Sequence, residues 1–220
     1  MIIWLNGTFG AGKSTTARRL ADRLRNARHF DPELVGYLLM AALSDHEFSD
    51  FQDLPPWREL VPVFTEKIAG FTGQHLIAAQ TVLREDYWRE LTQGFGRTPL
   101  DIFHVLLHVD SDVLAERIEA DELEAKARQW RLDHISDYEK SRRWMQAAAD
   151  LVIDATNLPV TDVAERIAAA AEKRTASSAP RHLLLAVFRG TLRPWRCSHC
   201  GARHERDRRL SSARWLSAAI

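Results

Sequence analysis

The segment that most constrains the fold is a glycine-rich stretch close to the start of the 220-residue chain. It satisfies the pattern G-x-x-x-x-G-K-[ST] and reads Gly7-Thr8-Phe9-Gly10-Ala11-Gly12-Lys13-Ser14. An apolar run, residues 2–5, precedes it, and a helical pattern containing Leu20 and Leu24 follows it. A strand, a glycine-rich turn and a helix in this order are the context in which the pattern binds phosphate, so the chain is expected to open with a phosphate-binding loop.

The residue types of this loop suit a polyphosphate. Glycine lets the backbone turn its N–H groups toward the phosphates, and the positive end of the following helix adds to the attraction. We expect Lys13 to bridge the β- and γ-phosphates of ATP and the Ser14 hydroxyl to bind Mg²⁺. A turn that binds nothing is the alternative, and the intact context argues against it. The predicted nucleotide contacts are Gly7, Thr8, Phe9, Gly10, Ala11, Gly12, Lys13, Ser14 and Thr15, with Arg117 and Asn157.

Short apolar runs alternate with helical patterns along the rest of the chain. Helices are expected from Asp31-Pro32 to Leu39, from Pro56 to Gly70, and at the end of the body over residues 160–171. This alternation implies βαβ units, and therefore an α/β fold with a parallel sheet flanked by helices. Five strands are expected, at residues 2–5, 27–30, 75–80, 102–109 and 151–153.

The composition changes near residue 175. Residues 175–180 are small and are typical of a linker, so we expect one domain over residues 1–174 and an extension over 181–220. The formal net charge is zero, but the extension holds nine Arg against two acids, a balance of +7, which leaves −7 for the other residues. An acidic body argues against nucleic acid as its partner. The basic extension is either a solvated tail or a contact for anionic lipid, RNA or the body itself.

Cysteine usage and hydropathy indicate a cytoplasmic protein. No run of about 18 uncharged apolar residues occurs, and Met1 leads directly into an apolar run without a basic leader. The two cysteines, Cys197 and Cys200, are too few and too close together for a disulfide framework. With His204 they offer three ligands for tetrahedral zinc, but a closed site needs four, and free thiols are the alternative.

Polar side chains at the carboxyl ends of the expected strands are candidates for substrate contacts, because ligands bind there in open parallel sheets. Asp31 follows the second strand, where a carboxylate could accept a hydroxyl proton, help to hold Mg²⁺, or cap the next helix. Glu33 is a weaker candidate, or a first-turn carboxylate favoured by the helix dipole. Gln80 and Thr81 end the third strand and are expected to face the substrate.

Phosphoryl transfer also needs positive charge around the transferred group. Arg117 is the arginine expected to supply it as a catalytic residue, while Arg128 either faces the substrate or lies on a solvated helix. Trp57 and Arg58 either cover the acceptor pocket or pack in the core. Asn157 lies beside the adenine or in an ordinary loop after the fifth strand.

Four segments together resemble the tunicamycin-resistance ATP-binding proteins: I-I-W-L-N-G-T-F-G-A-G-K-S-T at the start, D-P-E-L-V-G at 31–36, D-F-Q-D-L-P-P-W-R at 50–58 and D-A-T-N-L at 154–158. The resemblance covers roughly residues 1–173. The wider group contains chloramphenicol phosphotransferase and shikimate-kinase-like enzymes. The resemblance implies a sheet in the order 2-3-1-4-5, a carboxylate base at Asp31, and capture or ATP-dependent modification of a nucleoside antibiotic, with some membrane association. The tail beyond residue 180 departs from the family pattern.

These observations predict an ATP- and Mg²⁺-dependent phosphotransferase whose acceptor is a small hydroxylated molecule. Tunicamycin or a related nucleoside antibiotic is the acceptor that the resemblance suggests. The alternative is a protein that sequesters its ligand in an ATP-gated pocket without phosphoryl transfer. An RNA-associated ATPase that uses the basic tail fits less well, because the body of the chain is acidic. The sequence does not predict the oligomeric state.

Overall fold

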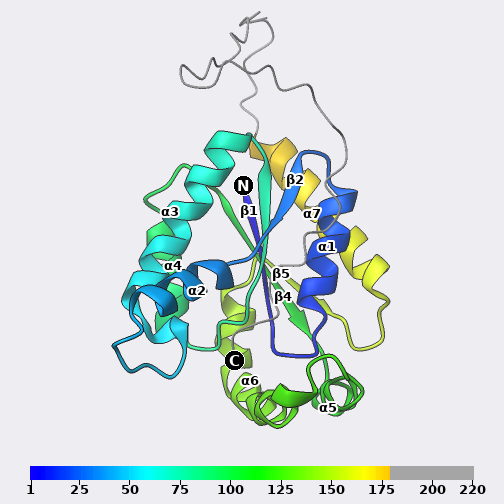
Figure 1. The fold of residues 1–220 in the computed structure, drawn as a ribbon. Helices are drawn as coiled ribbons and strands as arrows, with labels where there is room; N and C mark the ends of the chain where they lie inside the picture. The colour runs from blue at the N-terminus through cyan, green and yellow to red at the C-terminus, as the bar shows by residue number, and fades with distance from the viewer. Residues whose placement is uncertain (179–220) are drawn as a thin grey trace, which may run out of the picture. The chain divides into compact units, whose positions relative to one another are not determined.

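Five parallel strands form the centre of the fold, which confirms the predicted α/β class (Figure 1). A computed structural model describes residues 1–178 of the chain. The strands pair in the order β2-β3-β1-β4-β5, the order that the resemblance implied. Their bounds are β1 (Ile2–Asn6), β2 (Ala27–Phe30), β3 (His75–Ala79), β4 (Ile102–His108) and β5 (Leu151–Asp154).

Helices cover both faces of the sheet, which explains why the central strands are apolar on both sides. Neighbouring residues of β1 point to opposite faces, Ile3 into one core cluster and Trp4 into the other. Figure 1 shows α1 and α7 on one face, α3 and α4 on the other, and α5 and α6 beyond the carboxyl ends of the strands. The helices are α1 (Lys13–Arg23), α2 (Glu33–Ala42), α3 (Pro55–Thr72), α4 (Glu85–Phe95), α5 (Ser111–Glu119), α6 (Arg128–Ala148) and α7 (Val160–Ser178), with short 3₁₀ turns η1 (Phe51–Asp53) and η2 (Ala125–Ala127).

The position of β1 determines where a ligand can bind. β1 lies between β3 and β4 in the middle of the sheet, and its carboxyl end leads directly into the glycine-rich loop. The loops that follow β3, β4 and β5 emerge at the same edge, because all the strands are parallel. The phosphate-binding loop therefore stands at the centre of that edge.

The last helix is longer than the sequence predicted. α7 continues to Ser178, so residues 175–178 are helical and do not belong to a linker. Small residues tolerate a helix, and their hydroxyls return to the preceding turn: Thr175 Oγ1 donates to the carbonyl of Ala171 at 2.9 Å. The division into a domain and an extension stays a prediction, because the structure describes only residues 1–178. The basic extension, with its proposed membrane contact, and the zinc candidates Cys197, Cys200 and His204 lie outside the described residues.

Two further findings apply to residues 1–178. None of the helices there combines the length and the apolar character that crossing a membrane requires. That part of the chain also contains no group of three or more His, Cys, Asp or Glu side chains arranged to hold a metal ion.

Candidate nucleotide and acceptor site

The glycine-rich loop has a backbone shape that needs glycine. Gly7, Gly10 and Gly12 have φ angles of 140°, 79° and 85°, in the region that L-residues rarely adopt. Gly7 also has no room for a side chain, because a Cβ there would lie 2.6 Å from the carbonyl oxygen of Leu107 in β4. The loop is therefore pressed against the sheet at its start.

Lys13 lies at the centre of the loop with its charge poorly compensated. Its side chain is 9% exposed, and its Nζ donates to the main-chain carbonyl of Thr8 at 2.8 Å. Burial lowers the pKa of Lys13 to about 7; the Glu33 carboxylate opposes this effect and the Arg131 guanidinium adds to it. A phosphate beside Nζ would restore the opposite charge that this buried ammonium lacks.

Other groups around the loop also fit a polyphosphate. The Thr8 hydroxyl is buried and has no hydrogen-bond partner among the described residues. No side chain caps α1, whose Gly12 N-cap is left-handed, so the first-turn N–H groups, which have no intrahelical acceptor, are open to a ligand. Ser14 is exposed at the start of the helix, where its hydroxyl could bind Mg²⁺. The residues present thus fit ATP and Mg²⁺.

Asn6 joins this loop to the wall of the site, and the sequence analysis missed it. Its side chain is fully buried, and its Oδ1 accepts the N–H groups of Gly7 and Val82, both at 2.9 Å. Its Nδ2 donates to the carbonyl of Val82 at 3.2 Å. A polar residue that ends a fully apolar strand was the signal that could have identified it.

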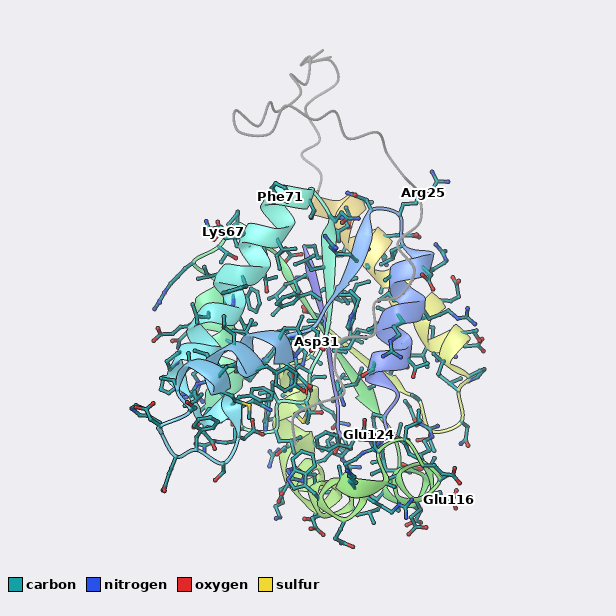
Figure 2. The ribbon with its side chains drawn as sticks, in the orientation of Figure 1. Arg25, Asp31, Lys67, Phe71, Glu116 and Glu124 are labelled. Carbon is teal, nitrogen blue, oxygen red and sulfur yellow. The ribbon has the colours of Figure 1, made fainter. Side chains whose placement is uncertain are left out.

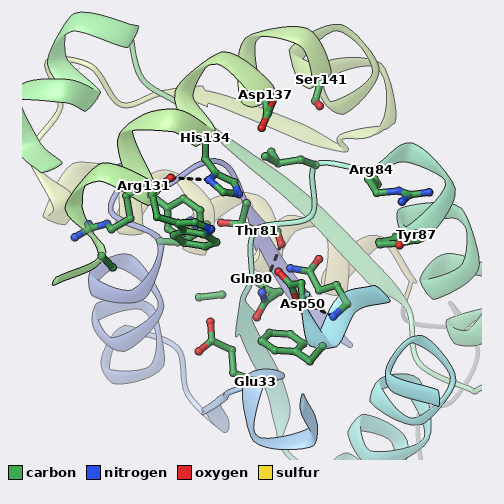
Figure 3. A pocket seen from close by; sticks show the side chains of 18 of the residues that line it. Glu33, Asp50, Gln80, Thr81, Arg84, Tyr87, Arg131, His134, Asp137 and Ser141 are labelled. Atoms are coloured by element: carbon green, nitrogen blue, oxygen red, sulfur yellow. Dashed lines mark hydrogen bonds between the residues drawn. The ribbon is translucent and has the colours of Figure 1, made fainter. Parts of the chain in front are cut away.

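A cavity of about 800 Å³ opens beside the loop (Figure 3). Its walls come from the glycine-rich loop, α2, η1, the segment after β3, and α6. The lining residues are Phe9, Lys13, Ser14, Glu33, Tyr37, Asp50, Phe51, Gln52, Asp53, Ala79, Gln80, Thr81, Leu83, Arg84, Tyr87, Glu124, Ala127, Trp130, Arg131, His134, Asp137, Lys140 and Ser141. Gln80 and Thr81, the predicted substrate contacts after β3, are among these lining residues.

Two carboxylates follow β2, and only Glu33 lines this cavity. Burial raises the pKa of Glu33, and the neighbouring Asp31 charge raises it further, while the Tyr37 hydroxyl, 3.1 Å from Oε2, and Lys13 oppose these effects. Asp31 instead accepts the N–H of Glu33 at 2.9 Å, as expected of a residue at a helix start. Of these two acids, Glu33 lines the cavity, and Asp31, the residue predicted as the base, is not among its lining residues.

Asp31 faces a different part of the surface. It lines a second hollow together with Leu34, Phe64 and Phe71, along α2 and α3. Figure 2 labels three residues of this hollow, Asp31, Lys67 and Phe71, and Glu124 of the main cavity. α2 begins at Glu33, two residues after Asp31. The two carboxylates therefore belong to different elements and have different surroundings.

Trp57 and Arg58 are structural and do not reach the cavity. Trp57 is fully buried, and its Nε1 donates to the carbonyl of Pro32 at 3.0 Å. Arg58 is 5% exposed; its Nε donates to Glu90 at 2.6 Å and its Nη1 to the carbonyl of Gln52. Core packing, which the sequence analysis left open for both residues, is what the geometry shows, because their neighbours satisfy their polar groups.

Arg117 contacts the backbone of the glycine-rich loop and of the loop after β5. Its guanidinium donates to the carbonyls of Ala155 at 3.1 Å, Thr156 at 2.9 Å and Gly10 at 3.4 Å. It therefore ties the glycine-rich loop to the loop after β5, where Asn157 is exposed. Neither Arg117 nor the expected Arg128 is among the residues that line the cavity.

Side chains of α6 form one wall of the cavity, and they include an aromatic pair that the sequence analysis did not single out. The ring of Trp130 packs against that of Phe9 in the loop, with 4.7 Å between the ring centroids. The centroids of the Trp130 and His134 rings are 4.1 Å apart. Arg131 lines the cavity with a side chain that is 12% exposed, and it donates to Asp121 at 2.9 Å. Periodicity alone could not distinguish these residues from a solvated helix, because charges surround them.

Comparisons with known proteins agree with this geometry. The family model described as "AAA domain" matches residues 2–143, more than half of the chain. No curated protein matches this chain. A tunicamycin resistance protein of Deinococcus radiodurans is similar in structure, with 27% identity and a TM-score of 0.58 over 77% of this chain and 94% of that one.

Two kinases share the fold at lower identity. The APS kinase of Mycobacterium tuberculosis is 21% identical, with a TM-score of 0.56 over 78% of this chain and 96% of its own. The shikimate kinase of Bacteroides thetaiotaomicron is 18% identical, with a TM-score of 0.52 over 78% of this chain and 98% of its own.

Proposed function

The chain belongs to the AAA-domain family of P-loop proteins, and on that premise we propose that it transfers the γ-phosphoryl group of ATP to a hydroxyl of a small molecule. The observation that carries the proposal is the meeting of Lys13 and Glu33 in one cavity, next to a loop whose N–H groups can hold phosphates. A buried ammonium suits the transferred phosphoryl group, and a carboxylate opposite suits the acceptor hydroxyl.

The proposed reaction is a phosphoryl transfer from ATP to the acceptor hydroxyl. The acceptor hydroxyl oxygen forms a bond to the γ-phosphorus while the bond from that phosphorus to the bridging oxygen breaks, and ADP leaves. Glu33 takes the hydroxyl proton, a task for which a raised pKa is favourable. Lys13 and Arg131 face the developing charge. Mg²⁺, held through the Ser14 hydroxyl, would neutralise part of the phosphate charge.

Arg117 has a positioning role in this proposal. Its hydrogen bonds to the carbonyls of Gly10 and Thr156 hold the loop in shape, and its guanidinium need not touch the reacting atoms. Asn157, exposed in the same loop after β5, stays a candidate for contact with the adenine. The acceptor that we propose first is tunicamycin or a related nucleoside antibiotic, because the structural relative with 27% identity is a tunicamycin resistance protein.

The proposal is tested by incubating the full chain with Mg·ATP and tunicamycin, and separately with a library of hydroxylated metabolites. Mass spectrometry should detect an acceptor that has gained one phosphoryl group. Tight binding of an acceptor without any phosphorylated product would instead favour sequestration, the alternative function.

A matched pair of variants tests the base. Glu33→Gln should lower kcat by about 10²–10⁴-fold while sparing nucleotide affinity, because it removes only the proton acceptor. Asp31→Asn removes one carboxylate two residues away but keeps the Oδ1 that accepts the Glu33 N–H, so kcat should change little. The reverse result, with Asp31→Asn inactive and Glu33→Gln active, would return the role to Asp31.

A further inference from the structure

The cations around the cavity are already engaged. Apart from Lys13 of the glycine-rich loop, three positively charged side chains line it, and each has a carboxylate partner within the described residues. Their ion pairs are Arg84 with Asp86 at 2.6 Å, Arg131 with Asp121 at 2.9 Å and Lys140 with Asp137 at 2.8 Å. An anionic acceptor would have to share these cations with protein carboxylates, which weakens the attraction that each cation can offer.

Three of the carboxylates that line the same cavity are in the opposite condition. Glu33, Asp50 and Asp53 form no ion pair with any described residue, and neutral groups supply their hydrogen bonds. These contacts are Tyr37 Oη to Glu33 at 3.1 Å, the Gln52 N–H to Asp50 at 2.8 Å, and Tyr87 Oη to Asp53 at 2.8 Å. Burial is the largest cause that raises the pKa of Asp50, as it is for Glu33, and the charges of His134 and Lys13 only partly oppose this rise. The acceptor side of the cavity is thus unfavourable for a negative charge.

Gln80 adds an independent observation. Its side chain is 4% exposed and lines the cavity, yet its Oε1 has no hydrogen-bond partner among the described residues. Its Nε2 reaches only the carbonyl of Thr81, at 3.5 Å. Buried acceptors in proteins are normally paired, so an open one in a cavity wall favours a ligand that brings an O–H or N–H donor.

These groups line two different sides of the cavity. In the view of Figure 3, Arg131, His134 and Asp137 of α6 lie along one side, and Glu33, Asp50 and Gln80 lie along the other. The ring of Phe51 also lines the cavity and offers an apolar surface, on which a sugar-like ring can pack.

From these observations, and resting on the proposed function, we infer that the acceptor is a sugar-like molecule rich in hydroxyl or amino donors and without negative charge. Gln80 Oε1 and the Asp50 carboxylate accept hydrogen bonds from it, and they act as specificity-determining residues. The shikimate and APS kinases share the fold, and this pocket should discriminate against anionic acceptors.

Three hexose derivatives that differ in charge test the inference. Glucose, glucosamine and gluconate are titrated against the full chain, with and without Mg·AMP-PNP, and their binding is followed by ligand-observed NMR. Glucose and glucosamine should bind at least about tenfold more tightly than gluconate, which corresponds to one unfavourable charge contact. Gluconate binding as tightly as glucose, or no binding by any of the three, would overturn the inference. Failure of AMP-PNP itself to bind would count against the proposed function instead.

Variants identify the groups responsible. Asp50→Asn keeps the Oδ1 that accepts the Gln52 N–H but removes the charge, so the preference for glucose over gluconate should fall about three- to tenfold. Gln80→Met keeps the volume and should weaken glucose binding about threefold to tenfold while sparing AMP-PNP. Asp45→Asn is the matched control, because it removes an exposed charge of the preceding loop that does not line the cavity. Equal effects from Asp50→Asn and Asp45→Asn would contradict a local role for Asp50.

Discussion

The two ends of the cavity are built in different ways. The proposed nucleotide end comes from one continuous stretch, residues 7–15, and offers backbone shape and N–H groups to a ligand. The proposed acceptor end is assembled from α2, η1, the segment after β3, and α6, and it offers side chains. A backbone site tolerates few substitutions, whereas a side-chain site can change its ligand by changing single residues. We therefore expect variants of the first end to abolish function and variants of the second to alter specificity.

The largest effect is expected for Lys13→Ala. Loss of the buried ammonium removes the charge that faces the transferred phosphoryl group, so kcat should fall about 10²–10³-fold or more. Single-turnover assays with Mg·ATP measure this loss. Lys67→Ala, on the exposed surface of α3, is the control and should be neutral. Unchanged turnover in Lys13→Ala would remove the distinction between the two ends of the cavity.

Gly7→Ala should be the most destabilising single change in the loop. A Cβ at Gly7 would lie 2.6 Å from the Leu107 carbonyl oxygen, and its φ of 140° is strained for alanine, so the free energy of unfolding should drop by about 2–4 kcal/mol. Urea denaturation measures the change. Gly70→Ala makes the opposite control, because no atom lies near a Cβ there and the helix should gain about 0.5–1 kcal/mol. Equal stability of the two variants would contradict the close packing of the loop.

Asn6→Ala tests the connection between the two ends. It leaves the buried N–H groups of Gly7 and Val82 without their acceptor, at a cost of about 2–3 kcal/mol in unfolding free energy. It should weaken both nucleotide and acceptor binding, measured by calorimetry. An effect on nucleotide binding alone would show that the two ends are independent.

The smallest predicted effect is a pH dependence of nucleotide affinity. The pKa of Lys13 is about 7 in the free protein because of burial. A polyphosphate binds the protonated form, so affinity should be constant below pH 7 and fall up to about tenfold per pH unit above it. Calorimetric titrations of AMP-PNP between pH 6 and 8.5 measure the slope. Lys13→Met should bind weakly with no such slope, and a steep slope in that variant would assign the titration to another group.

The same contrast explains how much of the molecule the sequence could predict. The second strand was expected at residues 27–30 and is observed as β2 (Ala27–Phe30), because its boundaries are marked by turn residues on both sides. The glycine-rich loop was predicted residue by residue, since its chemistry is local. The sheet order came from the resemblance and not from the residues, because strand order depends on packing between distant segments.

The acceptor end was harder to predict for the same reason. Asp31 and Glu33 are two residues apart, and sequence alone could not decide which carboxylate faces the cavity; the start of α2 at Glu33 decides it. Arg58 looked like a substrate contact, but Glu90, 32 residues away, satisfies its charge. Partners this distant in the chain leave no local pattern.

The buried amide of Asn6 gives the site a mechanical property. Its side chain forms hydrogen bonds both with the first residue of the glycine-rich loop and with the segment that carries Gln80 and Thr81. We expect any shift of Gly7 when a triphosphate binds to be passed through Asn6 to the segment after β3. We therefore expect binding at one end of the cavity to change the affinity at the other end through this one side-chain amide.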